Sequence, residues 1–112
     1  MKISEIAQLL EATIYCGEEY LDHEVHSCCG SDMMSDVLAF VKDQAVLLTG
    51  LVNPQVIRTA EMMDIVFLVL VRGKVPTDAM IELARERQLT VMSTNMRMFT
   101  ACGILYNAGL SD

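Results

Sequence analysis

Two histidines and a pair of adjacent cysteines near the start of the chain are the side chains best suited to hold a metal ion. His23 and His26 flank the acidic Glu24, and Cys28 and Cys29 follow closely. In a strand, however, successive side chains point to opposite faces, so His26 and Cys28 share one face while Cys29 takes the other. Because these ligands cannot converge without a bulge, we predict no metal site and no cofactor.

Cys102 is a further thiol that could do chemistry. A catalytic cysteine needs an activating base and an electropositive setting, and neither histidine is near Cys102 in the sequence. We therefore expect Cys102 to pack as a small hydrophobic residue, one turn after Met98 and beside Phe99. The chain carries four cysteines and no export signal, so we predict free, mostly buried thiols rather than disulfides.

Polar residues and glycines that follow three apolar runs are the candidates for a ligand site. In a parallel α/β sheet, ligands gather beyond the carboxyl ends of the strands, where helix N-termini point their free N–H groups. Two cations and several hydroxyls at one edge suit an anionic or nucleotide-like ligand, whereas ordinary loops and caps use the same residue types. Both interpretations remain open from the sequence. The candidate residues are Thr49, Gly50, Asn53, Arg72, Gly73, Lys74, Ser93, Thr94 and Asn95.

Motifs for phosphate transfer or hydride transfer are missing from the sequence. Gly50, Gly73 and Gly109 are isolated glycines, and no glycine-rich turn is followed by Lys-Ser or Lys-Thr. The sequence also offers no recognisable set of acid, base and nucleophile. We therefore predict that the protein is not an enzyme and that no residue is catalytic.

The elements that must position the candidate residues alternate between strands and helices from residue 45 onward. Each unit has a short apolar run, a turn signal and a segment with helical spacing, which is typical of βαβ units. Asn53-Pro54 and Thr77 are predicted to begin the first two helices. The third strand is predicted to lead through Asn95 into the last helix, which Gly109 ends. The crossover rule makes the strands parallel. These strands are expected at residues 45–49, 65–71 and 90–93.

The first 44 residues are predicted to add a helix, two strands and a second helix. Apolar spacing from Ile3 to Leu10 predicts the first helix, with Ser4 as its cap, and Ser31 or Asp32 is expected to cap the second. The strands are expected at residues 13–15 and 24–28. The fold class is therefore α/β, a small three-layer-type domain with a mostly parallel sheet from three C-terminal βα units plus an N-terminal helix and strand pair.

Composition limits the classes of partner. A length of 112 residues fits one domain, and a hydrophobic content of 53% exceeds what such a domain needs for its interior, so we expect a homodimer. A net charge of −7 argues against nucleic acid and anionic membranes. The longest apolar run, 65–71, is too short to span a membrane, and the chain begins without a signal-peptide profile, so we expect a cytoplasmic protein.

Four stretches of the chain, by their order and spacing, resemble the DRTGG domain family, and the resemblance covers nearly the whole chain as a single domain, 1–112. The family is related to the N-terminal domain of HPr kinase/phosphorylase and is reminiscent of the first domain of Mur ligases. The resemblance implies a small α/β fold and a non-catalytic accessory module associated with dimer contacts. The stretches are Ile3-Ser4-Glu5-Ile6-Ala7, Leu21-Asp22-His23-Glu24-Val25, Leu70-Val71-Arg72-Gly73 with Pro76 beyond, and Val91-Met92-Ser93-Thr94 with Phe99 following.

The residues that give the family its name differ here. Where the family places Asp-Arg, this chain has the region from Leu51 to Pro54, and where it places Thr-Gly-Gly, this chain reads Val71-Arg72-Gly73. The family's domains occur beside CBS pairs in regulated pyrophosphatases, within long phosphotransacetylases, and as short free-standing proteins encoded with iron hydrogenase components. The departures resemble the short free-standing type.

Two functions follow as hypotheses. The first is a homodimeric regulatory or protein-interaction module that acts on an unidentified partner protein, with redox or hydrogenase metabolism as the setting that the resemblance implies. The alternative is a small-molecule sensor that binds a nucleotide or another anionic ligand at the C-terminal ends of the strands.

Overall fold

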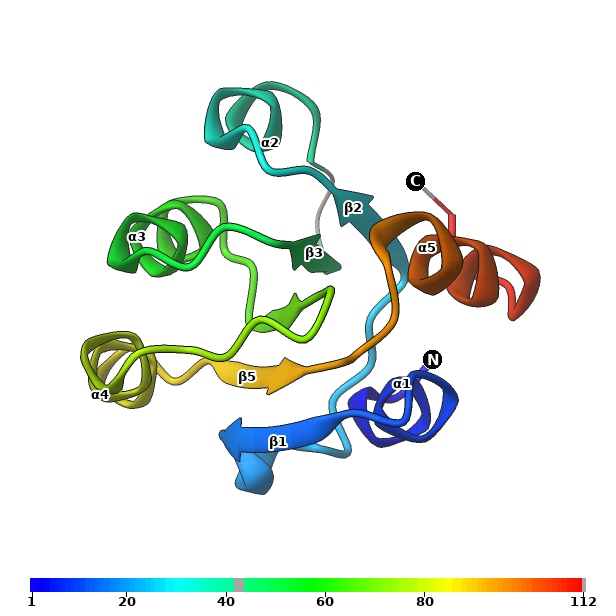
Figure 1. Cartoon of the computed structure of the whole chain (residues 1–112), viewed down its shortest axis with the longest axis horizontal. Helices are drawn as coiled ribbons and strands as arrows, with labels where there is room; N and C mark the ends of the chain where they lie inside the picture. The colour runs from blue at the N-terminus through cyan, green and yellow to red at the C-terminus, as the bar shows by residue number, and fades with distance from the viewer. Residues whose placement is uncertain (42–43, 112) are drawn as a thin grey trace.

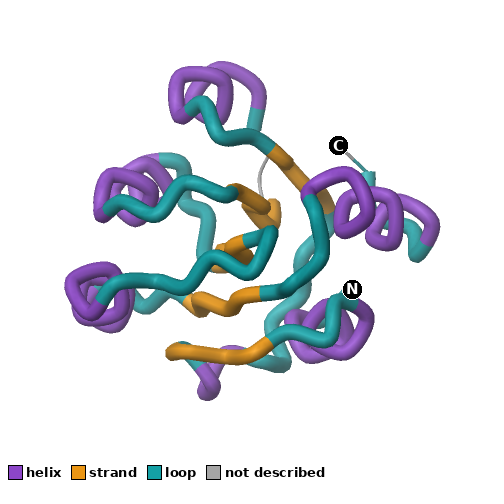
Figure 2. The backbone as a smooth tube through the Cα atoms, viewed as in Figure 1, coloured by secondary structure: helices purple, strands orange, loops and turns teal. Residues whose placement is uncertain are grey.

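The computed structural model describes residues 1–41 and 44–111, which form a central five-stranded sheet with helices on both faces (Figures 1 and 2). The strand order in the sheet is β1-β5-β4-β3-β2. In chain order the elements are α1 (Ile3–Leu9), β1 (Thr13–Cys16), the 3-10 helix η1 (Glu18–Tyr20), β2 (Ser27–Gly30), α2 (Met34–Phe40), β3 (Ala45–Thr49), α3 (Pro54–Met62), β4 (Phe67–Leu70), α4 (Asp78–Glu86), β5 (Thr90–Ser93) and α5 (Met98–Asn107).

The sheet is mostly parallel, as the sequence predicts. Strands β2, β3, β4 and β5 pair in parallel, and β1 runs antiparallel beside β5. The three predicted C-terminal βα units are confirmed as β3-α3, β4-α4 and β5-α5. The two N-terminal strands do not pair with each other, because β1 and β2 form opposite edges of the sheet.

Two hydrophobic cores lie on the two faces of the sheet, which makes the domain three-layered. Alternate residues of β3 divide between them: Val46 and Leu48 pack with α1 and α5, whereas Leu47 packs with α2, α3 and α4. The arrangement is visible in Figure 1, where α1 and α5 lie on one side of the sheet and the other three helices on the opposite side. The residues of β3, β4 and β5 are all buried, as expected of central strands with helices on both faces.

The helix starts in the second half follow the predicted capping chemistry. The Asn53 side chain accepts a hydrogen bond from the N–H of Gln55 at 2.8 Å, and the Thr77 hydroxyl accepts one from the N–H of Met80 at 3.1 Å. Pro54 occupies the first turn of α3, where a missing N–H costs nothing. These caps fix where the chain leaves the carboxyl ends of β3 and β4.

Three local predictions for the N-terminal region are wrong. Helix α1 begins after Lys2, so Ser4 lies inside its first turn, where the Ser4 N–H donates to the carbonyl of Leu21. The residue before α2 is Met33, so neither Ser31 nor Asp32 is its cap. The predicted strand at 24–28 instead spans 27–30, because Ser27 to Gly30 form the register with β3 while residue 24 bridges to Lys2.

Two boundaries in the second half also differ from prediction. The ladder of β4 covers only 67–70 of the predicted 65–71, since the chain reaches Ile65 from a left-handed residue, Asp64, with φ of 55°. Helix α5 begins at Met98 rather than directly after Asn95. Among the described residues, no helix is long and apolar enough to cross a bilayer.

Candidate functional site

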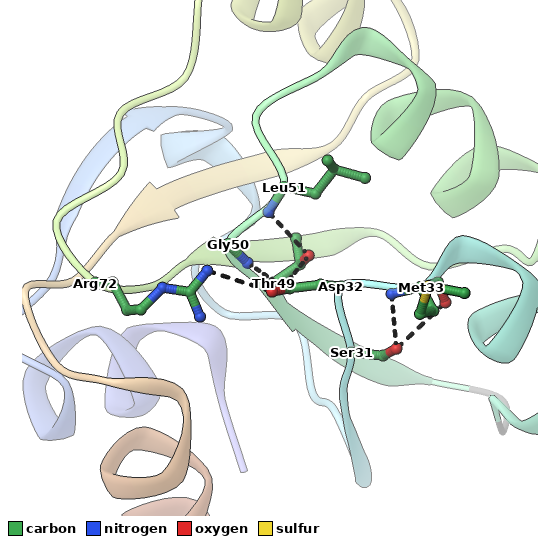
Figure 3. Close-up of polar contacts among 7 residues, drawn as sticks. All are labelled: Ser31, Asp32, Met33, Thr49, Gly50, Leu51 and Arg72. Atoms are coloured by element: carbon green, nitrogen blue, oxygen red, sulfur yellow. Dashed lines mark hydrogen bonds and ion pairs between the residues drawn. The ribbon is translucent and has the colours of Figure 1, made fainter.

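Four residues meet through polar groups at the carboxyl ends of β2, β3 and β4, and we call this group the rim cluster: Asp32, Thr49, Gly50 and Arg72 (Figure 3). One carboxylate oxygen of Asp32 accepts hydrogen bonds from the Gly50 N–H at 2.6 Å and from the Thr49 hydroxyl at 3.1 Å. The other oxygen pairs with the Arg72 guanidinium at 3.2 Å. The donors at two strand ends, those of β3 and β4, are thus directed at a single anionic group that follows β2.

The local sequence explains how Asp32 reaches this position. After β2, the Ser31 hydroxyl accepts a hydrogen bond from the N–H of Met33 at 3.0 Å, which turns the chain toward α2. Asp32 lies between these two residues and its side chain points to β3 instead of to the helix (Figure 3). Side chains that usually cap helices are therefore used here to build a turn and an ion pair.

Arg72 is held in a strained backbone conformation. Its φ is 59°, in the left-handed region that non-glycine residues rarely adopt, and the next residue, Gly73, has φ of 70°. The backbone N–H of Arg72 donates to the carbonyl of Met96 at 2.8 Å, and that of Gly73 donates to the carbonyl of Thr94 at 2.9 Å. These bonds from the β5-α5 connection stabilise the turn that aims Arg72 at Asp32.

Gly50 leaves the space that the Arg72 side chain fills. A Cβ atom at residue 50 would lie 1.9 Å from the terminal Nη2 nitrogen of Arg72, which is far inside van der Waals contact. The guanidinium can therefore lie against Asp32 only because residue 50 is glycine.

The electrostatics of the rim cluster favour a charged Asp32. The Gly50 N–H holds the pKa of the Asp32 carboxyl below its usual range, and the Thr49 hydroxyl and Arg72 lower the pKa further against the opposing effect of burial. The side chains of Arg72 and Asp32 remain 40% and 47% exposed, so solvent screens the ion pair. Chemically, the cluster is an anion-binding arrangement that the chain occupies with its own carboxylate.

The other predicted ligand residues divide into structural and exposed groups. The Ser93 hydroxyl donates to the carbonyl of Lys74, and the Thr94 hydroxyl donates to the carbonyl of Leu10 at 2.6 Å. Both side chains, like that of Asn53, are thus used to hold the fold. Lys74 and Asn95 are exposed; Lys74 follows Arg72 by two residues in the chain, and the Asn95 side-chain oxygen would lie 3.3 Å from a Cβ at Gly73.

Sequence reasoning brings Thr49, Gly50 and Arg72 to one place correctly but misses Asp32. The sequence signal that could have indicated Asp32 is its position two residues after the end of β2, because Arg72 follows the end of β4 by the same two residues. Because the strand was predicted to end at residue 28, Asp32 was assigned to the helix instead of to the rim.

The cysteines are placed as the alternation rule predicts, with one addition. Cys28 packs with the α1/α5 core and Cys29 with the opposite core. All four cysteines are free; Cys16 is buried and the others are half-buried. Cys102 does pack against the core, and it also lines the same pocket as Cys28. In the described part of the chain, no three His, Cys, Asp or Glu residues are grouped closely enough to hold a metal ion.

Comparison with known proteins decides the family. The model of the DRTGG domain matches residues 5–108, which is nearly the whole chain. The chain belongs to the DRTGG domain family. No curated protein matches this DRTGG chain at a significant level.

A solved structure shares the DRTGG fold seen here. It contains the CBS and DRTGG domains of the regulatory region of Clostridium perfringens pyrophosphatase, complexed with the activator diadenosine tetraphosphate. The TM-score is 0.76 at 19% sequence identity, and the match covers 99% of this chain. The chain spans 48% of the length of that structure. At this identity the likeness shows the fold alone.

Proposed function

We propose that this DRTGG domain is a non-catalytic regulatory and protein-interaction module of the cytoplasm that forms a homodimer through the outer face of α5. Membership of a family found in the regulatory region of a pyrophosphatase supports the regulatory role. The observation that carries the proposal is the exposed apolar surface of one helix.

The outer face of α5 has the character of an interface. Phe99 is 87% exposed and Tyr106 is 72% exposed, whereas aromatic side chains normally gain stability by burial. The helix Met98–Asn107 contains no charged residue, although 21% of the chain is charged. A charge-free helix with two exposed aromatic rings is typical of a surface that a partner covers.

The spacing on α5 favours a second copy of the same chain as that partner. Gly103 lies four residues after Phe99 and three before Tyr106, so the three residues follow one side of the helix. Nothing lies within 4 Å of a Cβ at Gly103, which leaves room for a close helix approach. A twofold axis at Gly103 would place Phe99 of each copy against Tyr106 of the other.

The mass in solution tests the dimer. Light scattering is expected to give twice the 12.4 kDa of one chain. Phe99→Glu puts a charge into the contact and is expected to weaken association at least about 100-fold. Phe40→Glu is the matched control, because it changes another exposed phenylalanine on α2, on the opposite face of the sheet, and should leave association unchanged. A wild-type mass of one chain, or equal effects of the two substitutions, would contradict the proposal.

The partner protein that we infer for this dimer belongs to redox or hydrogen metabolism. The support is the resemblance to short free-standing family members, which occur with iron hydrogenase components. The purified dimer should co-elute with candidate hydrogenase components in gel filtration. A partner that binds only the dimer should no longer co-elute with the Phe99→Glu variant, whereas a partner that binds each chain separately still should.

A second function, the binding of an anionic ligand or nucleotide, is favoured by the rim cluster. Donors from Gly50, Thr49 and Arg72 already hold one carboxylate, and Lys74 adds a second exposed cation nearby. A ligand phosphate would replace the Asp32 carboxylate on these donors. The solved pyrophosphatase region has a nucleotide activator, which supports testing adenine nucleotides first.

A thermal-shift experiment tests this second function. ATP or diadenosine tetraphosphate at ~100 times its dissociation constant adds about 2.7 kcal/mol, a shift of several degrees. Asp32→Ala should strengthen nucleotide binding because the competing carboxylate is gone, and Arg72→Leu should abolish it. If neither wild type nor Asp32→Ala shifts with any nucleotide, the rim cluster is a structural ion pair only.

A further inference from the structure

Three sulfur atoms gather around Gly30, where β2 meets α5. Cys28 and Cys102 line one pocket together with Gly30. A Cβ atom at Gly30 would lie 2.7 Å from Cys102 Sγ and 3.1 Å from Met98 Sδ, so both sulfurs border the space above this glycine. We call Cys28, Met98 and Cys102 the sulfur site.

The two elements that carry the sulfur site direct its side chains to one place. Residues 28 and 30 of β2 share the face that points to α5, while Cys29 packs with the core on the opposite face. On α5, Met98 and Cys102 are four residues apart and therefore neighbours on one side of the helix. A strand and a helix, rather than loops, thus hold the sulfurs, which favours a defined geometry.

The surroundings of the sulfur site suit a soft ion. A pocket of about 170 Å³ adjoins it, lined by Cys28, Gly30, Cys102, Tyr106, Leu110 and Ser111. These lining residues include no carboxylate and no imidazole, the side chains that hard or borderline cations prefer. Thiolate and thioether sulfur together select Cu(I) over such cations.

We propose that Cys28, Cys102 and Met98 bind one Cu(I) ion in a three-coordinate sulfur site. Binding forms two bonds from Cu(I) to thiolate sulfur and one to the neutral thioether, and both thiol protons leave to solvent. The metal keeps its oxidation state, so no oxidant or reductant is consumed. None of the three ligands belongs to the dimer contact proposed above, which shares only the pocket-lining Tyr106 with this site.

Anaerobic titration of the reduced protein with Cu(I), in competition with bicinchoninate, tests the site. We expect one Cu(I) per chain with thiolate-to-metal absorption in the ultraviolet. Cys28→Ser and Cys102→Ser should each weaken binding by at least about 100-fold, and Met98→Leu by about tenfold, as for a weaker neutral ligand. Cys29→Ser is the matched control, because it changes the neighbouring thiol on the opposite face, and should bind as wild type does.

Further outcomes separate the proposal from its rivals. Equal losses in Cys28→Ser and Cys29→Ser would show that the adjacent cysteines, not the sulfur site, hold the ion, and stoichiometric Zn(II) in place of Cu(I) would also overturn it. If a cysteine variant fails to fold, the wild-type protein still provides the test. Bound Cu(I) should protect Cys28 and Cys102, but not Cys29, from alkylation, and mass spectrometry measures the extent of alkylation at each cysteine. Phe99→Glu should bind Cu(I) normally even if it is monomeric, so the two proposals fail separately.

Discussion

The rim cluster and the sulfur site each take one residue from β2 or from the turn directly after it. They differ in whether their polar groups already have partners within the protein. At the rim, three donors face the Asp32 carboxylate, and the group is internally complete. At the sulfur site, two thiols line a pocket, with a thioether alongside. The carboxyl edge of a parallel sheet, where ligands usually bind, is here occupied by the protein's own Asp32 side chain. The packing contact between β2 and α5 instead leaves sulfur atoms next to a pocket.

Glycine-to-alanine substitutions should show the largest difference between the two regions in the free energy of unfolding. In Gly30→Ala the new Cβ meets Cys102 Sγ at 2.7 Å within the packed β2-α5 contact, and overpacking should cost about 1–3 kcal/mol. In Gly50→Ala the new Cβ meets the mobile end of Arg72, which can swing into solvent, so the cost should stay below about 1 kcal/mol. Urea unfolding measures both, and a larger loss in Gly50→Ala would reverse the comparison.

Removing Cys28 should slow the chemistry of Cys102. Without the hydrogen bond that lowers it, the pKa of Cys102 rises from about 7 toward its ordinary value, and the thiolate fraction at neutral pH falls. Iodoacetamide should therefore alkylate Cys102 about tenfold more slowly in Cys28→Ala, and the midpoint of the pH–rate profile should move upward. An unchanged midpoint would show that the two thiols do not share a proton.

The Asp32 carboxylate of the rim cluster should make the free energy of unfolding depend on pH in the acid range. The folded-state pKa of Asp32 is lowered, so its contribution to stability is present above the unfolded-state pKa and is lost as pH falls through the folded-state value. At neutral pH, Asp32→Asn should lower the free energy of unfolding by up to about 1 kcal/mol, because the exposed ion pair is screened. Once the pH lies below the folded-state pKa of Asp32, the two proteins should be equally stable, as both side chains are then neutral. A difference that persists in acid would point to packing rather than charge.

The change in stability should be smallest when glycine replaces Arg72 and relieves its left-handed backbone. Arg72→Gly relieves the left-handed conformation while losing the ion pair, so its stability should stay within about 0.5 kcal/mol of wild type. Arg72→Ala loses the pair and keeps the strain, and should be about 1 kcal/mol less stable than Arg72→Gly. Equal stabilities of the two variants in urea unfolding would show that residue 72 is not strained.

Local rules predicted the second half of the fold because its signals act over short distances. Asn53-Pro54 and Thr77 cap the helices that they precede, and alternate residues of β3 serve the two faces. In the first half, side chains that often cap helices, Ser31 and Asp32, form a turn and an ion pair instead. Their partners lie on other strands, so the choice between the two uses is made by tertiary contacts.

The candidate sites were predictable to the extent that topology brings strand ends together. That rule placed Thr49 and Arg72 at one rim, but it could not show that a carboxylate from β2 completes the cluster. The sulfur site joins Cys28 to Cys102 across most of the chain, and no local spacing indicates that contact. Its sequence signal is only the presence of cysteines and methionine in a strand and a helix that come to pack together.

A disulfide placed on the proposed twofold axis tests the dimer most directly. In a Cys102→Ser background, Gly103→Cys puts one thiol at the predicted closest approach of two α5 helices, and Met62→Cys puts one at an exposed position of α3, on the opposite face of the sheet. Oxidised glutathione should link most Gly103→Cys chains into a covalent dimer and leave Met62→Cys largely monomeric, since a disulfide needs Cα atoms within about 7 Å. Equal crosslinking of both variants, or none in Gly103→Cys, would contradict a homodimer built on α5.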